Sequence, residues 1–145
     1  MPSGLGLKPP FKFSASTRVG FSDTDAQGIV YYGRYMPYFD LARVEYHRRL
    51  DLMGVEDGYE FVMRATTVEY LAPARFDDLL EVYCRVARVG RTSVSYELAA
   101  YKVEEDLLLV TAEQTLVLVD LHHRKACPIP DSWRRSVEEF EGKGV

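Results

Sequence analysis

One helical pattern dominates the chain, and the long segments that follow it have the character of β-strands. Between residues 35 and 50, apolar and aromatic side chains recur at a spacing that places them on one face of an α-helix. Pro37 fits this helix because proline is tolerated in the first turn, and Gly54 is a stop signal. The residues of the apolar face are Tyr35, Tyr38, Phe39, Ala42, Tyr46 and Leu50.

The segments predicted to be strands are residues 11–21, 61–71, 80–87, 92–103 and 107–119. In residues 80–87 apolar and more polar side chains alternate, which is typical of a half-buried strand. Tight turns separate the later segments, and a short helix with Trp133, Val137 and Phe140 on one face closes the chain. The order β-α-β-β-β-β predicts an α+β fold, with an antiparallel sheet curled around the one sizeable helix.

The chain has 145 residues and 47% hydrophobic residues, which suits one domain with a real core. We expect a flexible tail over residues 1–10 and a single domain over residues 11–140. The segment 107–119 is too apolar to leave one face in water, which favours a homodimer or homotetramer.

Several classes of protein are disfavoured by composition. The net charge of −4 argues against a nucleic-acid binder, and no run of about 18 apolar residues could span a membrane. Cys84 and Cys127 lack CxxC spacing, so neither a disulfide framework nor a zinc site is expected, and the cytoplasm is the simplest location. We expect Cys84 in the core, His47 at a surface or interface, and no metal site at His122 and His123.

The segment from Phe21 to Tyr35 carries the chemistry. Asp23 and Asp25 lie between a strand and the start of the helix. Gly28, three residues after Asp25, allows the backbone to turn sharply before the helix. The first turn of a helix has unpaired N–H groups and the positive end of the dipole. A carboxylate beside such donors suits acyl transfer. Acids before a helix are also common as caps, and this is the role we expect for Asp23.

The segment resembles the 4-hydroxybenzoyl-CoA thioesterase family, including its YbgC-like branch of acyl-CoA thioesterases. The likeness covers residues 16–120, although YbgC-like members commonly have histidine where this chain has Tyr32. The matching residues are Asp23, Asp25, Gly28, Ile29, Val30, Tyr31 and Tyr35, then Phe39, Ala42 and Arg43, Tyr70-Leu71-x-Pro73-Ala74-Arg75-x-Asp77-Asp78, and the hairpin Gly90-Arg91-Thr92-Ser93.

The resemblance implies the hot-dog fold, assembled as dimers or tetramers with active sites at the dimer interface. It implies that Asp25 is the catalytic carboxylate and that the Tyr32 N–H polarises the thioester carbonyl. It also implies contacts with the substrate. Those expected around the acyl group come from Gly28, Val30, Tyr31 and residues 61–66, and those expected around coenzyme A come from Arg88, Arg91, Thr92 and Ser93.

We therefore expect hydrolysis of an acyl-CoA thioester without a metal or redox cofactor, coenzyme A being part of the substrate. Asp25 acts either as a general base toward water or as a nucleophile, and the sequence leaves both roles open. Two alternatives also stay open: a non-catalytic acyl-CoA or acyl-carrier binder, and a hot-dog dehydratase of hydroxyacyl thioesters that uses His47. No Gly-x-Ser-x-Gly motif of a serine hydrolase is present.

Overall fold

The computed structural model describes residues 6–54 and 58–145. The elements lie within one or two residues of the predicted segments at most boundaries, with two short 3₁₀-helices and a two-residue strand added. In order they are β1 (Ser14–Arg18), η1 (Phe21–Asp23), η2 (Tyr32–Arg34), α1 (Tyr35–Arg49), β2 (Tyr59–Tyr70), β3 (Leu79–Val89), β4 (Ser93–Lys102), β5 (Leu107–Asp120), β6 (Lys125–Ala126) and α2 (Asp131–Glu141).

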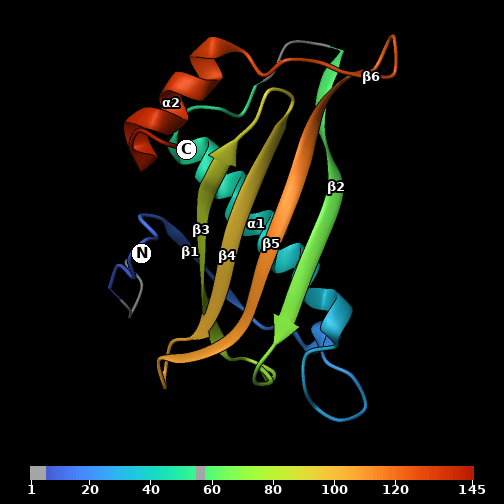
Figure 1. Cartoon of the computed structure of the whole chain (residues 1–145). Coiled ribbons are helices and arrows are strands. Elements are labelled where there is room, and N and C mark those ends of the chain that lie inside the picture. Colours follow the sequence, from blue (N-terminus) through green and yellow to red (C-terminus); the bar gives the residue numbers. More distant parts are fainter. Residues whose placement is uncertain (1–5, 55–57) are drawn as a thin grey trace.

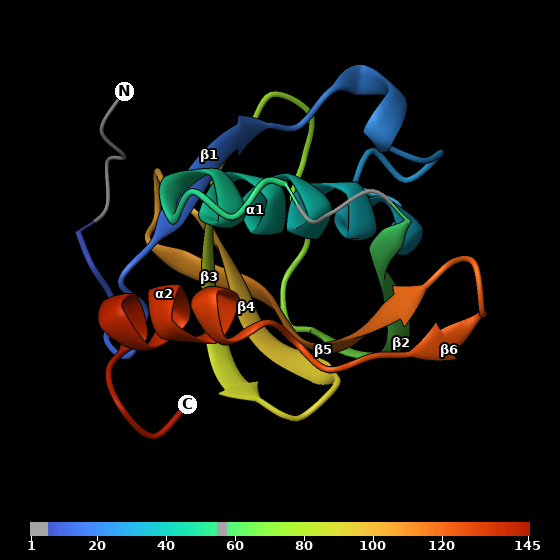
Figure 2. The ribbon, with the colours of Figure 1, turned by 90° about the horizontal axis from the view of Figure 1, so that it is seen from above.

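The strands form one sheet in the order β1-β3-β4-β5-β2, and β6 pairs with β5 outside this path (Figure 1). Each pairing in the described part of the chain is antiparallel. The sheet curves around α1, which lies along its concave face, and α2 lies near the C-terminal end of α1 (Figure 2). The α+β hot-dog fold implied by the resemblance is confirmed.

The apolar face of α1 supplies the centre of the core. Tyr35, Tyr38, Phe39, Ala42 and Tyr46 are buried, as their helical spacing predicts. They pack against the inward-facing residues of the sheet, since alternate residues of a strand point to the same face. This half of the core includes Leu80, Val82, Cys84, Leu98, Val110, Ala112, Leu116 and Leu118.

The end of α1 differs from the prediction. The helix ends at Arg49, and Leu50 is its C-cap, several residues before Gly54. Asp51 takes the left-handed conformation with φ of 58°, which aspartate tolerates better than most residues. The Asp51 N–H bonds the Arg48 carbonyl and the Leu52 N–H bonds the His47 carbonyl, so the last turn closes without a glycine.

The apolar side chains of strand β5 are largely buried within one chain. It lies between β4 and β2, and its residues Val110, Ala112, Leu116 and Leu118 are buried under α1. The strand with exposed apolar side chains is instead β2, at the edge of the sheet, where Val62 and Met63 are each 42% exposed. The strand that favours a homo-oligomer is therefore β2 and not β5, because the outer edge of β2 has no neighbouring strand in the described chain.

The two ends of the sheet carry different groups of predicted site residues. The loop with Asp25, the η2 helix and the end of β2 lie at one end, and the turn between β3 and β4 lies at the other (Figure 1). Part of the expected tail packs on the sheet, since Gly6 accepts a hydrogen bond from the Tyr83 hydroxyl and Lys8 forms an ion pair with Asp106. Residues 1–5 lie outside the described residues. Within the part that the structure describes, no helix has the length and apolar character needed to cross a bilayer.

Candidate active site

Asp25 opens a tight hairpin turn between β1 and the first helical turn of η2. Thr24 and Val30 form an antiparallel bridge, and the Asp25 N–H donates to the Ile29 carbonyl at 2.9 Å. The Gly28 N–H donates back to the Asp25 carbonyl at 2.9 Å, and Gly28 has φ of 80°. That conformation favours glycine, so the role of Gly28 in this chain is to close the turn that presents Asp25.

The Asp25 side chain is half-buried and has one hydrogen bond. Its Oδ1 accepts from the Gln27 N–H at 2.8 Å, an Asx turn that restrains the carboxyl group. Within the described residues, Oδ2 has no hydrogen-bond donor from the protein. One carboxylate oxygen therefore holds the side chain in place, and the other is available to an incoming molecule.

Asp23 has the structural role that its position before the helices predicts. Its Oδ2 accepts from the Gly20 N–H at 3.0 Å and from the Tyr38 hydroxyl at 2.7 Å, and Oδ1 lies 3.3 Å from Arg34 Nε. The Tyr38 pKa is raised above its usual value by burial and by this hydrogen bond to the carboxylate. Asp23 thus joins η1 to α1 and has no free oxygen for chemistry.

The start of η2 supplies amide donors. Within the described residues, the N–H groups of Tyr32 and Gly33 have no acceptor, as expected for the first residues of a helix that continues into α1. The carbonyl ahead of each is engaged: that of Tyr31 accepts from the Arg34 N–H at 2.8 Å, and that of Tyr32 accepts from the Tyr35 N–H. Hydrogen bonding at a carbonyl polarises the N–H of the same peptide unit, which strengthens these two donors.

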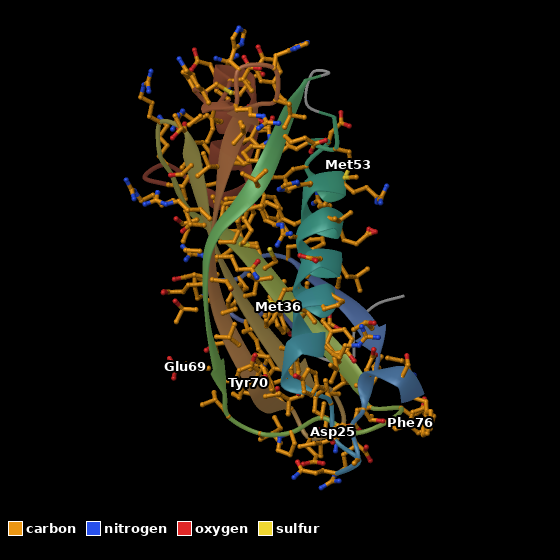
Figure 3. All side chains as sticks on the ribbon, turned by 90° about the vertical axis from the view of Figure 1, so that its right-hand side faces the viewer. Asp25, Met36, Met53, Glu69, Tyr70 and Phe76 are labelled. Carbon is orange, nitrogen blue, oxygen red and sulfur yellow. The ribbon has the colours of Figure 1, made fainter. Side chains whose placement is uncertain are left out.

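Tyrosine rings surround these amides. The Tyr31 and Tyr32 rings lie with centroids 4.5 Å apart, and Tyr32 contacts Tyr70 edge-on at 6.2 Å. Tyr70 ends β2 and also packs on Tyr35, with ring centroids 5.8 Å apart. Figure 3 shows Tyr70 at the same end of the molecule as Asp25, with Met36 further along between α1 and β2. Tyr31, Tyr32 and Tyr70 are 44%, 62% and 48% exposed, so part of each ring is free to contact a ligand.

The other residues predicted to contact the acyl group differ in their exposure. Val30 is buried in the core, and its N–H donates to the Ala74 carbonyl at 2.9 Å. Residues 62–67 of β2 are exposed on both faces of the sheet edge. Three surface cavities of about 520, 330 and 350 Å³ lie elsewhere, and Asp25 lines none of them. None of these three cavities of the described residues therefore provides an acyl pocket beside the polar groups.

The residues expected to contact coenzyme A are not brought to Asp25 within one chain. Arg88, Arg91, Thr92 and Ser93 lie around the turn between β3 and β4, at the end of the sheet opposite the Asp25 loop (Figure 1). Both arginine side chains are exposed. The turn is held by backbone bonds, for example from the Leu118 N–H to the Thr92 carbonyl at 2.9 Å.

His47 is half-buried and packs against Phe61, Tyr96 and Trp133 of its own chain, so the expectation of a surface position was wrong, and that of an interface position stays a prediction. Its Nε2 lies 2.6 Å from the Tyr96 hydroxyl, and burial, together with the nearby Arg43 charge, lowers the His47 pKa to about 4. His47 lies twelve residues beyond Tyr35, which is about 18 Å along the helix at 1.5 Å per residue. No observation therefore places it beside Asp25 of the same chain, as a dehydratase pair would require.

Cys84 and His123 are two further side chains with chemical potential, as a nucleophile and as a metal ligand. Cys84 is buried in the core as predicted, and burial raises the pKa of its thiol, which disfavours the reactive thiolate. His123 has an acidic partner three positions earlier, since its Nδ1 lies 2.8 Å from Asp120 Oδ2. Within residues 6–54 and 58–145, no group of three metal-binding side chains was found.

Tyr70 was missed as a site residue, although it stands in the motif that carries the resemblance. Its hydroxyl donates to the Tyr32 carbonyl at 3.1 Å, across 38 positions of sequence. A tyrosine that ends a strand is the only local signal, and that signal does not indicate which loop the hydroxyl reaches.

Comparison with known proteins points to one group. A family model described as the thioesterase-like superfamily matches residues 19–137. The acyl-CoA thioester hydrolase YbgC of Escherichia coli O6:H1 is 35% identical over 123 residues, which are 83% of this chain and 91% of that protein. The acyl-CoA thioesterase YbgC of Haemophilus influenzae is 34% identical over 122 residues, 81% of this chain and 88% of the relative.

A solved structure agrees with these sequence matches. The crystal structure of a probable thioesterase from Bartonella henselae superposes with a TM-score of 0.72 at 29% identity, covering 81% of this chain and 97% of that one.

Proposed function

Because this chain belongs to the thioesterase-like superfamily, we propose that it hydrolyses acyl-CoA thioesters to a carboxylate and free coenzyme A, with Asp25 as its catalytic carboxylate. One observation carries the proposal. A half-buried carboxylate with a free oxygen and two unpaired, polarised amides are presented by consecutive turns of one short segment. The sequence relatives named as acyl-CoA thioester hydrolases support the same reaction.

In the proposed reaction, the N–H groups of Tyr32 and Gly33 bind the thioester oxygen and stabilise the negative charge that develops on it. Asp25 either removes a proton from the attacking water or attacks the carbonyl carbon itself. The C–S bond then breaks, and the departing thiolate takes up a proton to give coenzyme A. In the nucleophilic case water hydrolyses the mixed anhydride, so both routes give the same products.

The proposed assembly is a homodimer or homotetramer whose sites are completed by a second copy. The exposed edge of β2 supports this, since a long unpaired strand with apolar side chains is suited to pairing with another chain. Antiparallel pairing of two β2 edges would reverse the second copy. The second copy's β3–β4 turn, with its Arg88 and Arg91, would then lie at the same end as the Asp25 of the first.

This arrangement gives the predicted coenzyme A residues a place in the proposal. Guanidinium groups are suited to binding phosphate, and hydroxyl groups such as those of Thr92 and Ser93 can donate to the same oxygens. The second copy would also contribute walls to the acyl pocket beside Asp25, which none of the three cavities of the described residues provides.

The test is the Asp25→Asn variant, which keeps the shape of the side chain and its hydrogen bond from Gln27. Turnover of a panel of acyl-CoA substrates, measured as thiol release with a thiol-reactive dye, should fall by about 100-fold or more, because the reaction loses its base or nucleophile. The matched control is Asp51→Asn at the far end of α1, where asparagine accepts the positive φ.

Thiol release in the Asp25→Asn variant close to that of the control would refute the role of Asp25. Binding of acyl-CoA without thiol release in the unmodified protein would favour the alternative of a non-catalytic binder.

A further inference from the structure

Tyr70 makes a contact that links the edge strand to the amides of the site. It is the last residue of β2, and its hydroxyl donates to the Tyr32 carbonyl oxygen at 3.1 Å. Its ring packs against the rings of Tyr32 and Tyr35, with centroids 6.2 and 5.8 Å away. Figure 3 shows the side chain at the end of β2 nearest Asp25, while Glu69 points away from the molecule.

The Tyr32 carbonyl and the Gly33 N–H belong to one planar trans peptide unit, so they point in opposite directions. A hydrogen bond that holds the carbonyl therefore also fixes the direction of the Gly33 N–H. The preceding unit, which carries the Tyr32 N–H, is held through the Arg34 N–H bond to the Tyr31 carbonyl. Among the described residues, Tyr70 supplies the side-chain hydrogen bond, which reaches the Tyr32 carbonyl. The other bonds to the Tyr31 and Tyr32 carbonyls come from backbone N–H groups of the helix.

The Tyr31 ring leaves little space for a side chain at Gly33. A Cβ at this position would lie 3.1 Å from Cε2 of the Tyr31 ring, a tight contact that glycine avoids. The Tyr31 ring thus packs closely against Gly33, while the Tyr70 hydroxyl bonds the carbonyl of the peptide unit that carries the Gly33 N–H.

We propose that Tyr70 is a positioning residue, which orients and polarises the Tyr32–Gly33 peptide unit so that the Gly33 N–H serves as a second donor to the thioester oxygen, beside the Tyr32 N–H. This inference rests on the proposed function, and it adds the side chain that holds the Gly33 donor in place. Tyr70 acts through the peptide bond and contributes no proton to the reaction. Tyr70 is 48% exposed, and its hydroxyl could bond to water in place of the Tyr32 carbonyl.

The kinetic experiment compares Tyr70→Phe with the intact protein. Phenylalanine keeps the ring contacts with Tyr32 and Tyr35 and removes only the hydroxyl. We expect kcat for acyl-CoA hydrolysis to fall about tenfold, because the donor is loosened and not deleted, with KM changed less than about twofold. The matched control is Tyr101→Phe on β4, where the ring contacts Lys8 and Tyr83, and it should leave kcat unchanged.

A spectroscopic experiment measures the hydrogen bonds from the amides to the thioester carbonyl without hydrolysis of the thioester. In the Asp25→Asn background, the bound thioester of an isotope-labelled acyl-CoA is observed by its carbonyl stretching frequency in difference Raman spectra. Hydrogen bonds from the amides should lower this frequency on binding, and adding Tyr70→Phe should reverse part of that shift. Adding Tyr101→Phe should not.

The outcomes separate this inference from the proposed function. A carbonyl shift that is the same with and without the Tyr70 hydroxyl, together with an unchanged kcat, would overturn the positioning role and leave Asp25 chemistry intact. A thioester that shows no shift in the Asp25→Asn protein would overturn the amide site itself, and with it both proposals. A fall in thermal stability with kcat preserved at 25 °C would assign Tyr70 a purely structural role.

Discussion

Neighbouring residues of the same type have different roles here because their contacts differ. Asp23 and Asp25 are two positions apart, yet Asp23 accepts hydrogen bonds from Gly20 and Tyr38 and pairs with Arg34, whereas Asp25 accepts one bond from Gln27. A carboxylate that is fully bonded stabilises a fold, and one with a free oxygen can meet a substrate. Composition and spacing alone do not distinguish the two.

His47 is a residue-scale example of a titratable group used for structure. Burial and the Arg43 charge lower its pKa to about 4, so it stays neutral in the folded chain where the unfolded chain is protonated below its ordinary pKa of 6.5. The unfolded state therefore binds more protons, and the stabilisation is complete above pH 6.5 and is lost as the pH falls toward 4.

The prediction compares the intact protein with His47→Gln, which can still bond the Tyr96 hydroxyl but does not titrate. Between pH 7 and pH 5 the free energy of unfolding of the intact protein should fall by about 2 kcal/mol more than that of the variant. Urea unfolding at the two pH values measures this difference. An equal fall in both proteins would show that His47 is not held neutral.

At the scale of elements, α2 is fastened to the core by its last residue. The Glu141 carboxylate accepts from the Tyr46 hydroxyl at 2.6 Å and from the Val86 N–H at 3.1 Å, which joins α2 to both α1 and β3. Arg134 adds bonds to the carbonyls of Val89 and Gly90. The Tyr46 pKa is raised by burial and by this carboxylate, so the hydroxyl remains a donor.

Replacement of Glu141 by alanine should lower the free energy of unfolding by about 2 kcal/mol, since two donors at the core boundary lose their acceptor. Glu139→Ala, on the exposed side of the same helix, is the matched control and should change it by less than about 0.5 kcal/mol. Chemical unfolding followed by tryptophan fluorescence suits the measurement, because Trp133 lies in α2. Equal stabilities of the two variants would mean that α2 is held by packing alone.

At the scale of the whole molecule, α1 covers the concave face of the sheet, and the outer edge of β2 has no neighbouring strand in the described chain. The described chain places the Asp25 loop at one end and the β3–β4 turn at the other (Figure 1). In the proposed homo-oligomer, a second copy brings its β3–β4 turn to the Asp25 end. The exposed Val62 and Met63 lie on the edge strand where such a copy would pair.

The double substitution of Val62 and Met63 by lysine should therefore convert the proposed homo-oligomer to monomer, because edge lysines oppose strand pairing. Thiol release should fall with it, since the acyl pocket would lose its second wall. The control is Val44→Lys, which adds a charge to the exposed face of α1 at a residue that is 39% exposed. Light scattering after size exclusion measures the mass, and an assembly that persists in the double variant would place the contact elsewhere.

Local patterns in the sequence determined the elements of this protein. Helical spacing from Tyr35 to Tyr46 and strand alternation after residue 60 depend on which side chains share a face, and that is set by the geometry of each element itself. The motif around Asp25 also indicated the turn and the free amides, because caps and turns are made by residues close in the chain.

Contacts between distant segments were decided only by the tertiary structure. The bond from Tyr70 to the Tyr32 carbonyl, the contact of His47 with Tyr96 and the separation of Arg88 and Arg91 from Asp25 all depend on how the sheet curls and in which order its strands pair. Strand order and curl arise from many weak packing contacts across the whole core, and no short stretch of sequence contains them.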